Sequence, residues 1–462
     1  MAKSVLDTIV ERRKERIEID KTRLPIALIE EQLTVSMRSL EEALRKPGPQ
    51  FILECKKASP SRGLLREDFD IEKILTVYND YAAAISVLTE PDYFQGADAN
   101  LTLVKQQSNK PVLCKDFIFD EYQILKARYY GADAVLLMLS VLDDDDYRSL
   151  HKVATKWQMD VLTEVHTEEE LHRATQLGAK IIGINNRNLK DLSIDIETSM
   201  KLSAKNTSRS LLVSESGIQS YQHIKHLASS VDAFLVGSAL MSIPNLRKAS
   251  AGLTHGDIKV CGLMHADIAQ IAARSGARYG GLIFAPKSIR AISVKQAKLI
   301  TEAADLDFVG VFVNQPIPEI VQTAALLKLF AVQLHGQEND AYRAELRREL
   351  PKGVEIWQAI PGNEVGSIEL VAYADRTLLD SKAGDAFGGT GQVLSWQDIP
   401  EKIKQDQRFI LAGGLSPNNI IEARQNFSGI LDVNSGVESV KGYKDSVKIS
   451  QLFAQLRDDY VI

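Results

Sequence analysis

The stretch PVLCKDFIFDEYQILKARYYGADAVLLMLS, residues 111–140, contains two short apolar runs separated by a segment of helical length. The first run, at 111–116, ends in a lysine and an aspartate, and the second covers 134–140. Continuous apolar runs of this length, joined by a helix, are typical of parallel strands that are buried on both faces. The stretch therefore predicts one strand–helix–strand unit.

The same pattern recurs along the whole chain of 462 residues. The first eight apolar runs are FILECK (51–56), AISVLTE (84–90), PVLCKD (111–116), AVLLMLS (134–140), VLTEVH (161–166), IIGINN (181–186), LLVSESG (211–217) and AFLVGS (233–238). The second eight are IKVCG (258–262), YGGLIFAP (279–286), FVGVFVN (308–314), AVQLHG (331–336), VEIWQAI (354–360), TLLDSK (377–382), FILAGG (409–414) and GILDVNS (429–435). Eight strand–helix units close a barrel of roughly 200–250 residues, so we predict an α/β protein of two consecutive (β/α)8 TIM barrels.

The composition is that of an ordinary globular protein, with 45% hydrophobic and 25% charged residues. The net charge of −6 argues against nucleic acid as a partner, because phosphate-binding surfaces are usually basic. No run approaches the roughly 18 apolar residues of a membrane span, and the first residues lack the apolar core of a signal peptide. Three cysteines are too few for a disulfide framework and too scattered for a metal site. We therefore expect a cytoplasmic protein without a membrane partner, and we expect it to be a monomer.

Residues 1–46 precede the first run and are predicted to form a helical extension, because apolar residues between 5 and 10 recur at helical spacing. The sequence Pro-Gly-Pro at 47–49 ends this extension just before the first strand. A barrel does not need such a segment, so two alternatives stay open. The extension either caps one end of the barrel or decorates its outside.

The join between the barrels falls near residues 248–260, where small and polar side chains predict a short linker. We place the first domain at 1–252 and the second at 256–462. The segments SESGI (214–218) and LVGSAL (235–240) of the first half have counterparts at LAGGLSP (411–417) and LDVNSGVE (431–438) in the second. These pairs fall at strands seven and eight, where barrels commonly bind phosphate through backbone amides. The sequence thus predicts a phosphorylated substrate in each half.

Barrel enzymes carry their chemistry at the carboxyl ends of the strands. In the first half these ends supply Glu54, Lys56, Lys115, Glu164, Asn185, Arg187, Glu215 and Ser216. Because buried charges must be paired, such a set is either an acid–base site or an ion-pair network that closes the barrel. Lysine and glutamate held together shift each other's pKa, which suits proton transfer.

The strings ILECKKASPSRG (52–63), PVLCKDFI (111–118), LTEVH (162–166), GINNRNL (183–189), SESGI and LVGSAL resemble the motifs of indole-3-glycerol-phosphate synthases over nearly all of residues 1–250. The resemblance implies that Lys115 is the general acid of ring closure, that Lys56 holds the substrate carboxylate and that Glu164 aids proton transfer during dehydration. It also implies that Glu54, Asn185, Arg187, Glu215 and Ser216 line the site. The implied phosphate cradle consists of Ser59, Gly217, Gly237 and Ser238.

The reaction implied by this resemblance closes an indole ring on 1-(2-carboxyphenylamino)-1-deoxyribulose 5-phosphate, with loss of CO₂ and water. It needs no metal and no organic cofactor. In that family the helical extension packs near the barrel mouth.

In the second half, Cys261 follows the first strand and Asp380 ends the sixth. A cysteine at a strand end is often only a buried hydrophobe, but opposite an aspartate and beside a phosphate site it is better explained as a base paired with an acid. The strings KVCGL (259–263), GLIF (281–284), VGVFVN (309–314), VQLHG (332–336), LLDS (378–381), GGTGQ (388–392), LAGGLSPNN (411–419) and DVNSGVES (432–439) resemble phosphoribosylanthranilate isomerases over residues 256–462.

This second resemblance implies an Amadori rearrangement in which Cys261 takes the proton from C2′ and Asp380 protonates the furanose ring oxygen. Arg290 matches an arginine that meets the anthranilate carboxylate, although Ile289 stands where the family usually has proline. The implied phosphate-binding positions are Gly388, Gly389, Gly414, Ser435 and Gly436. His335 either contacts substrate or is structural, and both alternatives stay open.

The isomerase product is the synthase substrate, and the whole chain resembles the bacterial bifunctional enzymes that fuse the two, synthase first. One alternative is a Schiff-base aldolase with Lys115 as nucleophile. Another is a sugar-phosphate-binding scaffold in which one barrel has lost its activity.

Overall fold

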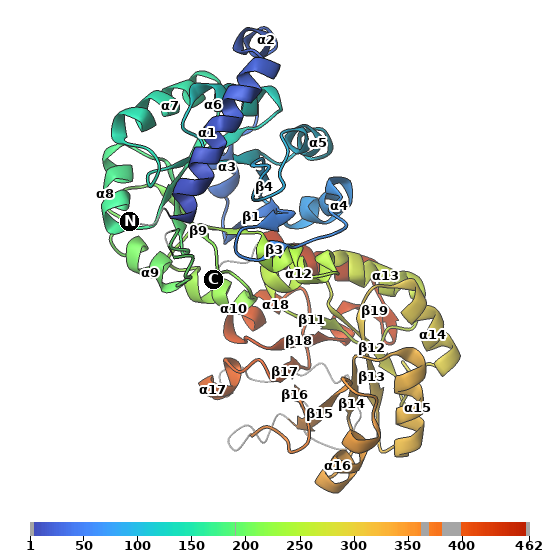
Figure 1. Cartoon of the computed structure of the whole chain (residues 1–462). Coiled ribbons are helices and arrows are strands. Elements are labelled where there is room, and N and C mark those ends of the chain that lie inside the picture. Colours follow the sequence, from blue (N-terminus) through green and yellow to red (C-terminus); the bar gives the residue numbers. More distant parts are fainter. Residues whose placement is uncertain (1–3, 190, 362–368, 381–398, 459–462) are drawn as a thin grey trace. The chain divides into compact units, whose positions relative to one another are not determined.

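The computed structural model describes residues 4–189, 191–361, 369–380 and 399–458. The chain divides into two compact units, the first ending at Ser250 and the second beginning at Ala251. Each unit holds one closed ring of eight parallel strands surrounded by helices (Figure 1). The predicted fold of two consecutive (β/α)8 barrels is therefore confirmed.

The strands of the first barrel pair with their sequence neighbours, and the last closes on the first, with Leu53 of β1 opposite Val236 of β10 and Ile85 of β4. They are β1 (Gln50–Cys55), β4 (Ala84–Leu88), β5 (Val112–Lys115), β6 (Ala134–Met138), β7 (Asp160–Val165), β8 (Ile181–Asn185), β9 (Leu211–Glu215) and β10 (Ala233–Val236). Most of their residues are buried on both faces, as expected for parallel strands between a filled interior and a helical layer.

The outer layer of the first barrel contains one helix after each strand. These helices are α4 (Ile71–Tyr81), α5 (Ala99–Gln107), α6 (Glu121–Tyr129), α7 (Asp144–Lys156), α8 (Glu168–Gln176), α9 (Glu197–Ser203), α10 (Tyr221–Leu227) and α11 (Ser238–Met241), and the hairpin β2 (Ala58–Ser59) and β3 (Gly63–Leu64) follows β1. Several helices begin at side-chain caps, such as Asp70 before α4 and Thr167 before α8, whose oxygens accept backbone N–H groups of the first turn.

The extension is helical only in parts, namely α1 (Val5–Arg23), α2 (Ile26–Glu30) and α3 (Leu40–Leu44). The segment between α2 and α3 is not helical, because its polar groups bind the loops that precede the strands, at the amino end of the barrel. The Ser36 amide donates to the Trp157 carbonyl at 2.9 Å, and the Ser36 hydroxyl donates to Asp133. Leu40 and Leu44 of α3 are fully buried among interior residues such as Leu113, so α3 closes the amino end of the barrel.

The second barrel has the same strand order. Its strands are β11 (Ile258–Val260), β12 (Tyr279–Ile283), β13 (Asp307–Phe312), β14 (Ala331–Leu334), β15 (Glu355–Pro361), β16 (Arg376–Asp380), β17 (Phe409–Ala412) and β18 (Ile430–Val433). Its helices are α13 (Ala266–Ser275), α14 (Val294–Ala303), α15 (Ile317–Leu327), α16 (Asp340–Glu349), α17 (Glu401–Lys404), α18 (Ile420–Asn426) and α19 (Ser446–Asp458), with the 3-10 turn η3 (Ser435–Val437) and the hairpin β19 (Glu438–Val440) and β20 (Tyr443–Lys444) before α19. Tyr279 and Trp357 fill its interior, with ring centroids 5.3 Å apart.

The expected linker near residues 248–260 is wrong in one respect. Helix α12 (Leu246–His255) runs through most of it, and Leu253 is buried. Alanine and leucine favour a helix strongly enough to outweigh the single Gly252 in its interior. The small residues there belong mostly to a helix rather than to an irregular connection.

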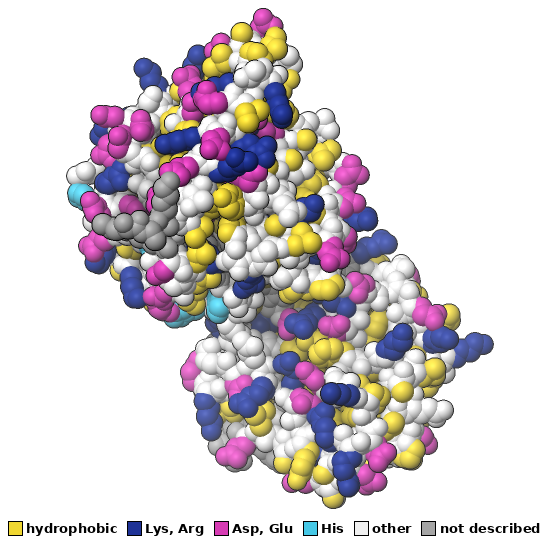
Figure 2. Space-filling model, in the orientation of Figure 1, with side chains coloured by type: hydrophobic (Ala, Val, Ile, Leu, Met, Phe, Trp, Pro, Cys, Tyr) yellow, Lys and Arg dark blue, Asp and Glu magenta, His cyan; other side chains and the backbone are white. Residues whose placement is uncertain are grey.

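None of the helices in the described ranges combines the length and the apolar character needed to cross a membrane. Figure 2 shows Lys and Arg side chains interspersed with Asp and Glu over the face that it draws. That face therefore carries mixed charge rather than a basic stripe.

Candidate active sites

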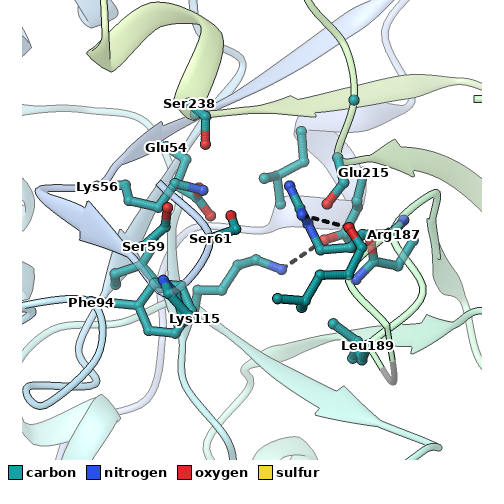
Figure 3. A pocket seen from close by; sticks show the side chains of 18 of the residues that line it. Glu54, Lys56, Ser59, Ser61, Phe94, Lys115, Arg187, Leu189, Glu215 and Ser238 are labelled. Atoms are coloured by element: carbon teal, nitrogen blue, oxygen red, sulfur yellow. Dashed lines mark hydrogen bonds and ion pairs between the residues drawn. The ribbon is translucent and has the colours of Figure 1, made fainter. Parts of the chain in front are cut away.

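A pocket opens at the carboxyl ends of the first barrel's strands. Every residue that the sequence predicted for the first site lines it: Glu54, Lys56, Ser59, Lys115, Glu164, Asn185, Arg187, Glu215, Ser216, Gly217, Gly237 and Ser238. Figure 3 shows the labelled Lys56, Ser59 and Ser238 on one side of the pocket and Arg187 and Glu215 on the other. The parallel barrel brings these positions together although they span almost 190 residues of chain.

Lys115, at the end of β5, reaches across this pocket to two carboxylates. Its Nζ lies 2.7 Å from Glu215 Oε2 at the end of β9 and 3.3 Å from Glu164 Oε2 on β7. Both carboxylates are buried, and Lys115 itself is largely buried. The centre of the pocket is therefore a lysine that donates to two acids.

The ionisation of this group is set by burial and by the close charges. Burial alone would lower the pKa of Lys115, but the charges of Glu215, Glu164 and Glu54 outweigh it and raise that pKa, so the ammonium persists at neutral pH. Burial, partly opposed by Lys115, raises the pKa of Glu215 to about 7. Glu215 also has a second oxygen, Oε1, that is buried and accepts no hydrogen bond from the described residues.

Two further pairs surround this centre. Asn185 Nδ2 donates to Glu164 Oε1 at 3.1 Å, which fixes the orientation of that carboxylate. Lys56 Nζ lies 2.5 Å from Glu54 Oε1, and both side chains lie at the end of β1. The Ser59 hydroxyl is buried without a hydrogen-bond partner in the described part of the chain. The pocket thus holds a polar group whose bonding is incomplete.

Two glycines leave room for the acids. A Cβ on Gly237 would lie 2.3 Å from Glu54 Oε1, and a Cβ on Gly183 would lie 2.0 Å from Glu215 Oε1. After Glu215 the chain turns sharply through two left-handed residues, Ser216 (φ 65°) and Gly217 (φ 80°). A serine in this conformation is strained, and such strain is concentrated at functional sites. The side-chain amide of Asn186 donates through Nδ2 to the Ser216 carbonyl at 3.0 Å and stabilises the turn.

The extension caps the mouth, which decides between the two alternatives for it. Val5, Leu6 and Ile9 of α1 line the pocket. Farther along α1, Arg13 donates through Nε and Nη2 to both oxygens of Asp116 at 2.9 and 2.6 Å, and both side chains are buried. Asp116 directly follows Lys115 in sequence, so this ion pair fixes α1 beside the centre of the pocket.

The sequence did not predict the apolar half of the pocket, which includes Phe94 and Phe117, with ring centroids 6.1 Å apart. The buried carboxylate of Glu90 accepts three backbone N–H groups, including that of Phe94 at 3.0 Å, and so holds the Phe94 loop. Aromatic residues in loops show no periodicity that would separate pocket from core. Ion pairs between α1 and this loop, such as that of Arg16 with Asp92 at 2.6 Å, could not be identified from the sequence.

In the second barrel, Cys261 directly follows β11 and is buried, and burial raises the pKa of its thiol. Asp380 ends β16, five strands farther along the ring. His335 follows β14 and connects to this aspartate, because its Nε2 lies 3.2 Å from Asp380 Oδ2. Its other ring nitrogen lies 3.3 Å from Gln333 Nε2. His335 therefore contacts the predicted acid, whether or not it also meets a substrate.

Arg290 is bound to a carboxylate of the chain itself. Its Nε and Nη2 donate to the two oxygens of Glu438 at 2.7 and 2.8 Å. Lys444 Nζ also donates to Glu438 at 2.6 Å and to Asn434 Oδ1 at 2.8 Å. Burial alone would raise the pKa of Glu438, but these donors lower it to about 2, so the carboxylate is ionised.

The predicted phosphate positions of the second barrel are described in part. Gly414 follows β17 with φ 69°, and Ser435 and Gly436 form the turn η3 after β18. A Cβ on Gly436 would lie 2.0 Å from the Leu415 carbonyl oxygen, so these two loops are in close contact. Gly388 and Gly389 lie outside the described residues.

The sequence reading also passed over Lys259, a fully buried cation on β11. Its position inside the apolar run IKVCG (258–262) could have identified it as a buried charge. Its Nζ donates to Asp432 Oδ2 at 2.6 Å and to Gln333 Oε1 at 2.9 Å.

Comparison with known families agrees with this division into two sites. Residues 6–253 match the family model described as indole-3-glycerol phosphate synthase, and residues 258–455 match that of N-(5'phosphoribosyl)anthranilate (PRA) isomerase. The tryptophan biosynthesis protein TrpCF of Vibrio cholerae is 47% identical over 98% of this chain and 96% of its own. The TrpCF of Salmonella typhi is 45% identical over 98% and 99% of the two chains, and that of Haemophilus influenzae is 44% identical over 97% and 96%.

The chain belongs to the TrpCF family. It is a bifunctional tryptophan-biosynthesis enzyme that acts on phosphorylated small molecules, with the synthase barrel first and the isomerase barrel second. The isomerase barrel converts N-(5-phosphoribosyl)anthranilate to 1-(2-carboxyphenylamino)-1-deoxyribulose 5-phosphate. The synthase barrel closes the indole ring of this product to give indole-3-glycerol phosphate. This assignment decides against the aldolase and the binding-scaffold alternatives.

Proposed function

We propose that the synthase reaction is centred on Lys115, and the observation that carries this proposal is the contact of its ammonium with Glu215 and Glu164 across the pocket. The ammonium protonates the ribulose carbonyl oxygen as the aryl carbon attacks it. Glu164, oriented by Asn185, then steers the proton transfer that accompanies loss of water. General acid–base groups of this kind contribute about 10²–10⁴ to the rate.

In this proposal Glu215 exchanges a proton with Lys115. The pKa of Glu215 is about 7, so at neutral pH this carboxyl readily gains or loses a proton. Lys56, held by Glu54, meets the carboxylate that is lost as CO₂. Ser59, Gly217, Gly237 and Ser238 bind the phosphate, and Ser59 has a hydroxyl free for that purpose in the described structure. Arg187 and Ser216 complete the wall of the site.

In the isomerase barrel, Cys261 acts as the base that removes the C2′ proton, and Asp380 protonates the ring oxygen. The contact of His335 with Asp380 orients that acid. Glu438 engages two nitrogens of Arg290 and leaves Nη1 to meet the anthranilate carboxylate. Gly414, Ser435 and Gly436, together with Gly388 and Gly389, supply amides to the phosphate.

The test supplies N-(5-phosphoribosyl)anthranilate to the full chain and follows the intermediate and indole-3-glycerol phosphate separately. Cys261→Ala is expected to abolish consumption of the first substrate while leaving turnover of added intermediate intact. Lys115→Ala is expected to accumulate the intermediate. If either variant retained both partial reactions, the assignment of that residue would be wrong.

We also propose that the enzyme works as a monomer in the cytoplasm, without a nucleic-acid partner. Its three cysteines are all free thiols, which suits a reducing compartment. The net charge of −6 and the mixed charges of Figure 2 do not favour phosphate backbones. The domain limits 1–252 and 256–462 belong to the same proposal, and sedimentation of the purified chain tests the monomer.

A further inference from the structure

The interior of the isomerase barrel contains a charged pair that the proposed acid–base chemistry leaves unexplained. Lys259 on β11 is completely buried and donates to Asp432 on β18 and to Gln333 on β14. Lysine is almost never fully buried unless it is paired. Replacing such a pair by apolar side chains is often neutral or stabilising, so stability gives little reason to keep it.

Lys259 lies two residues before Cys261. Side chains two residues apart in a strand point to the same face, so this lysine lies beneath the thiol in the barrel. Burial raises the pKa of Cys261, and the positive charge of the nearby Lys259 ammonium opposes that rise. On the other side, a Cβ on Gly281 would come within 2.6 Å of the Cys261 sulfur, so β12 covers the thiol closely.

The other charges around the thiol balance one another. Arg290 and Lys444 pack against the neighbouring Gly262, since a Cβ there would lie 2.8 Å from Arg290 Cδ and 3.4 Å from Lys444 Nζ. Both cations are bound to Glu438. Lys259 is instead bound to Asp432, whose second oxygen, Oδ1, is buried and has no hydrogen-bond partner among the described residues. The charge of Lys259 lowers the pKa of the thiol and that of Asp432 raises it, so the two members of this pair act on the sulfur in opposite directions.

We propose that Lys259 is a positioning residue whose buried ammonium favours ionisation of the Cys261 thiol, and that Asp432 limits this effect by binding the ammonium. The inference rests on the proposed role of Cys261 as the base. The thiol proton is lost to solvent, and the thiolate is stabilised by the positive charge of the Lys259 ammonium. It then takes the C2′ proton and becomes the neutral thiol again. Without the ammonium, burial would keep the sulfur protonated to a still higher pH.

The experiment compares three variants of the full chain, Lys259→Met, Asp432→Asn and the double variant. It measures isomerase kcat/KM against pH, together with the pH dependence of alkylation of Cys261 by a small thiol reagent, read by peptide mass spectrometry. Cys55 and Cys114 are internal controls, because both are buried in the other barrel.

In Lys259→Met, the rise of isomerase kcat/KM with pH is expected to occur at higher pH, because the thiol ionises less readily. The rate at neutral pH should be about 10²-fold lower and should recover as the pH rises. In Asp432→Asn, the rise of kcat/KM with pH is expected to occur at lower pH, because the substitution removes the negative charge that opposes the thiolate. The inference would be overturned if variants that are folded, as judged by circular dichroism, had the same pH profile of kcat/KM as the unmodified chain.

If Lys259→Met fails to fold because Asp432 is left unpaired, the double variant and Asp432→Asn still decide the question. The outcome also separates this inference from the proposed function. An inactive Cys261→Ala with unchanged pH profiles in the Lys259 and Asp432 variants rejects only the role of Lys259. An active Cys261→Ala rejects the proposed base itself.

Discussion

The two barrels have the same strand order but fill their interiors differently. In the synthase barrel, Leu40 and Leu44 of the extension close the amino end, so part of the core comes from outside the eight strand–helix units. In the isomerase barrel, Tyr279 and Trp357 of the strands themselves fill the same kind of space. One topology therefore accepts either a borrowed or an internal filling, provided that the interior is close-packed.

The barrels also bury their charges at different depths. Lys115 and its two carboxylates lie at the strand ends and line an open pocket. Lys259 and Asp432 lie inside the second barrel, with Lys259 completely buried. The same barrel topology therefore carries buried charge pairs either at its mouth or in its interior.

The largest effect is expected from breaking the contact between the extension and the synthase mouth. Arg13→Met leaves Asp116 buried without its partner, which costs about 3–5 kcal/mol of stability. We expect the synthase to lose activity at lower urea concentration while the isomerase keeps its midpoint. Arg16→Met is the matched control, because its pair with Asp92 is more exposed and is worth about 0–1 kcal/mol. Equal losses in both variants would contradict the anchoring role of Arg13.

The borrowed core gives the second prediction. Leu40→Ala removes a fully buried side chain from the closed end and is expected to destabilise the synthase barrel by about 2–5 kcal/mol. Urea unfolding followed by the two activities separately measures this loss. The exposed Leu28 on α2 is the control, since Leu28→Ala removes a side chain that is 47% exposed. An unchanged synthase midpoint in Leu40→Ala would mean that α3 does not contribute to the core.

Two interior glycines sharpen the comparison of the sites. Gly183→Ala is expected to displace Glu215, and Gly281→Ala to displace Cys261, because each added Cβ would meet its neighbour at 2.0 and 2.6 Å. A displacement of this size costs about 10² in rate. Steady-state assays should show that the first variant loses only synthase activity and the second only isomerase activity. Loss of both activities in either variant would show that the two sites are not independent.

The smallest effect concerns the pH dependence of stability. The pKa of Glu215 is raised on folding from 4.5 to about 7, so its protonated form stabilises the folded state. This contribution is present at low pH and is lost as the pH rises through about 4.5–7. Glu215→Gln removes it, so the variant should lose less stability than the unmodified chain over that interval. Urea midpoints of synthase-barrel unfolding, followed by circular dichroism between about pH 4.5 and pH 7, measure the difference. Parallel curves would contradict the raised pKa.

Much of the synthase site could be predicted, because its polar residues stand at strand ends, and strand ends meet in a parallel barrel. The apolar wall could not, because Phe94 and Phe117 come from loops whose course depends on contacts such as those of Glu90. The helical character of the short linker near residues 248–260 was missed, because small residues such as Ala249 and Ala251 occur in helices as readily as in connections.

By itself, the sequence determined the number of barrels, their order and the residues at the strand ends, since apolar runs of fixed length leave little choice of topology. Only the tertiary structure decided how these residues ionise and which of them are partners. Lys115 meets Glu215 across 100 positions of chain, and Lys259 meets Asp432 across 173. Burial and the distance between charges set their pKa values, and both quantities exist only after the barrels close.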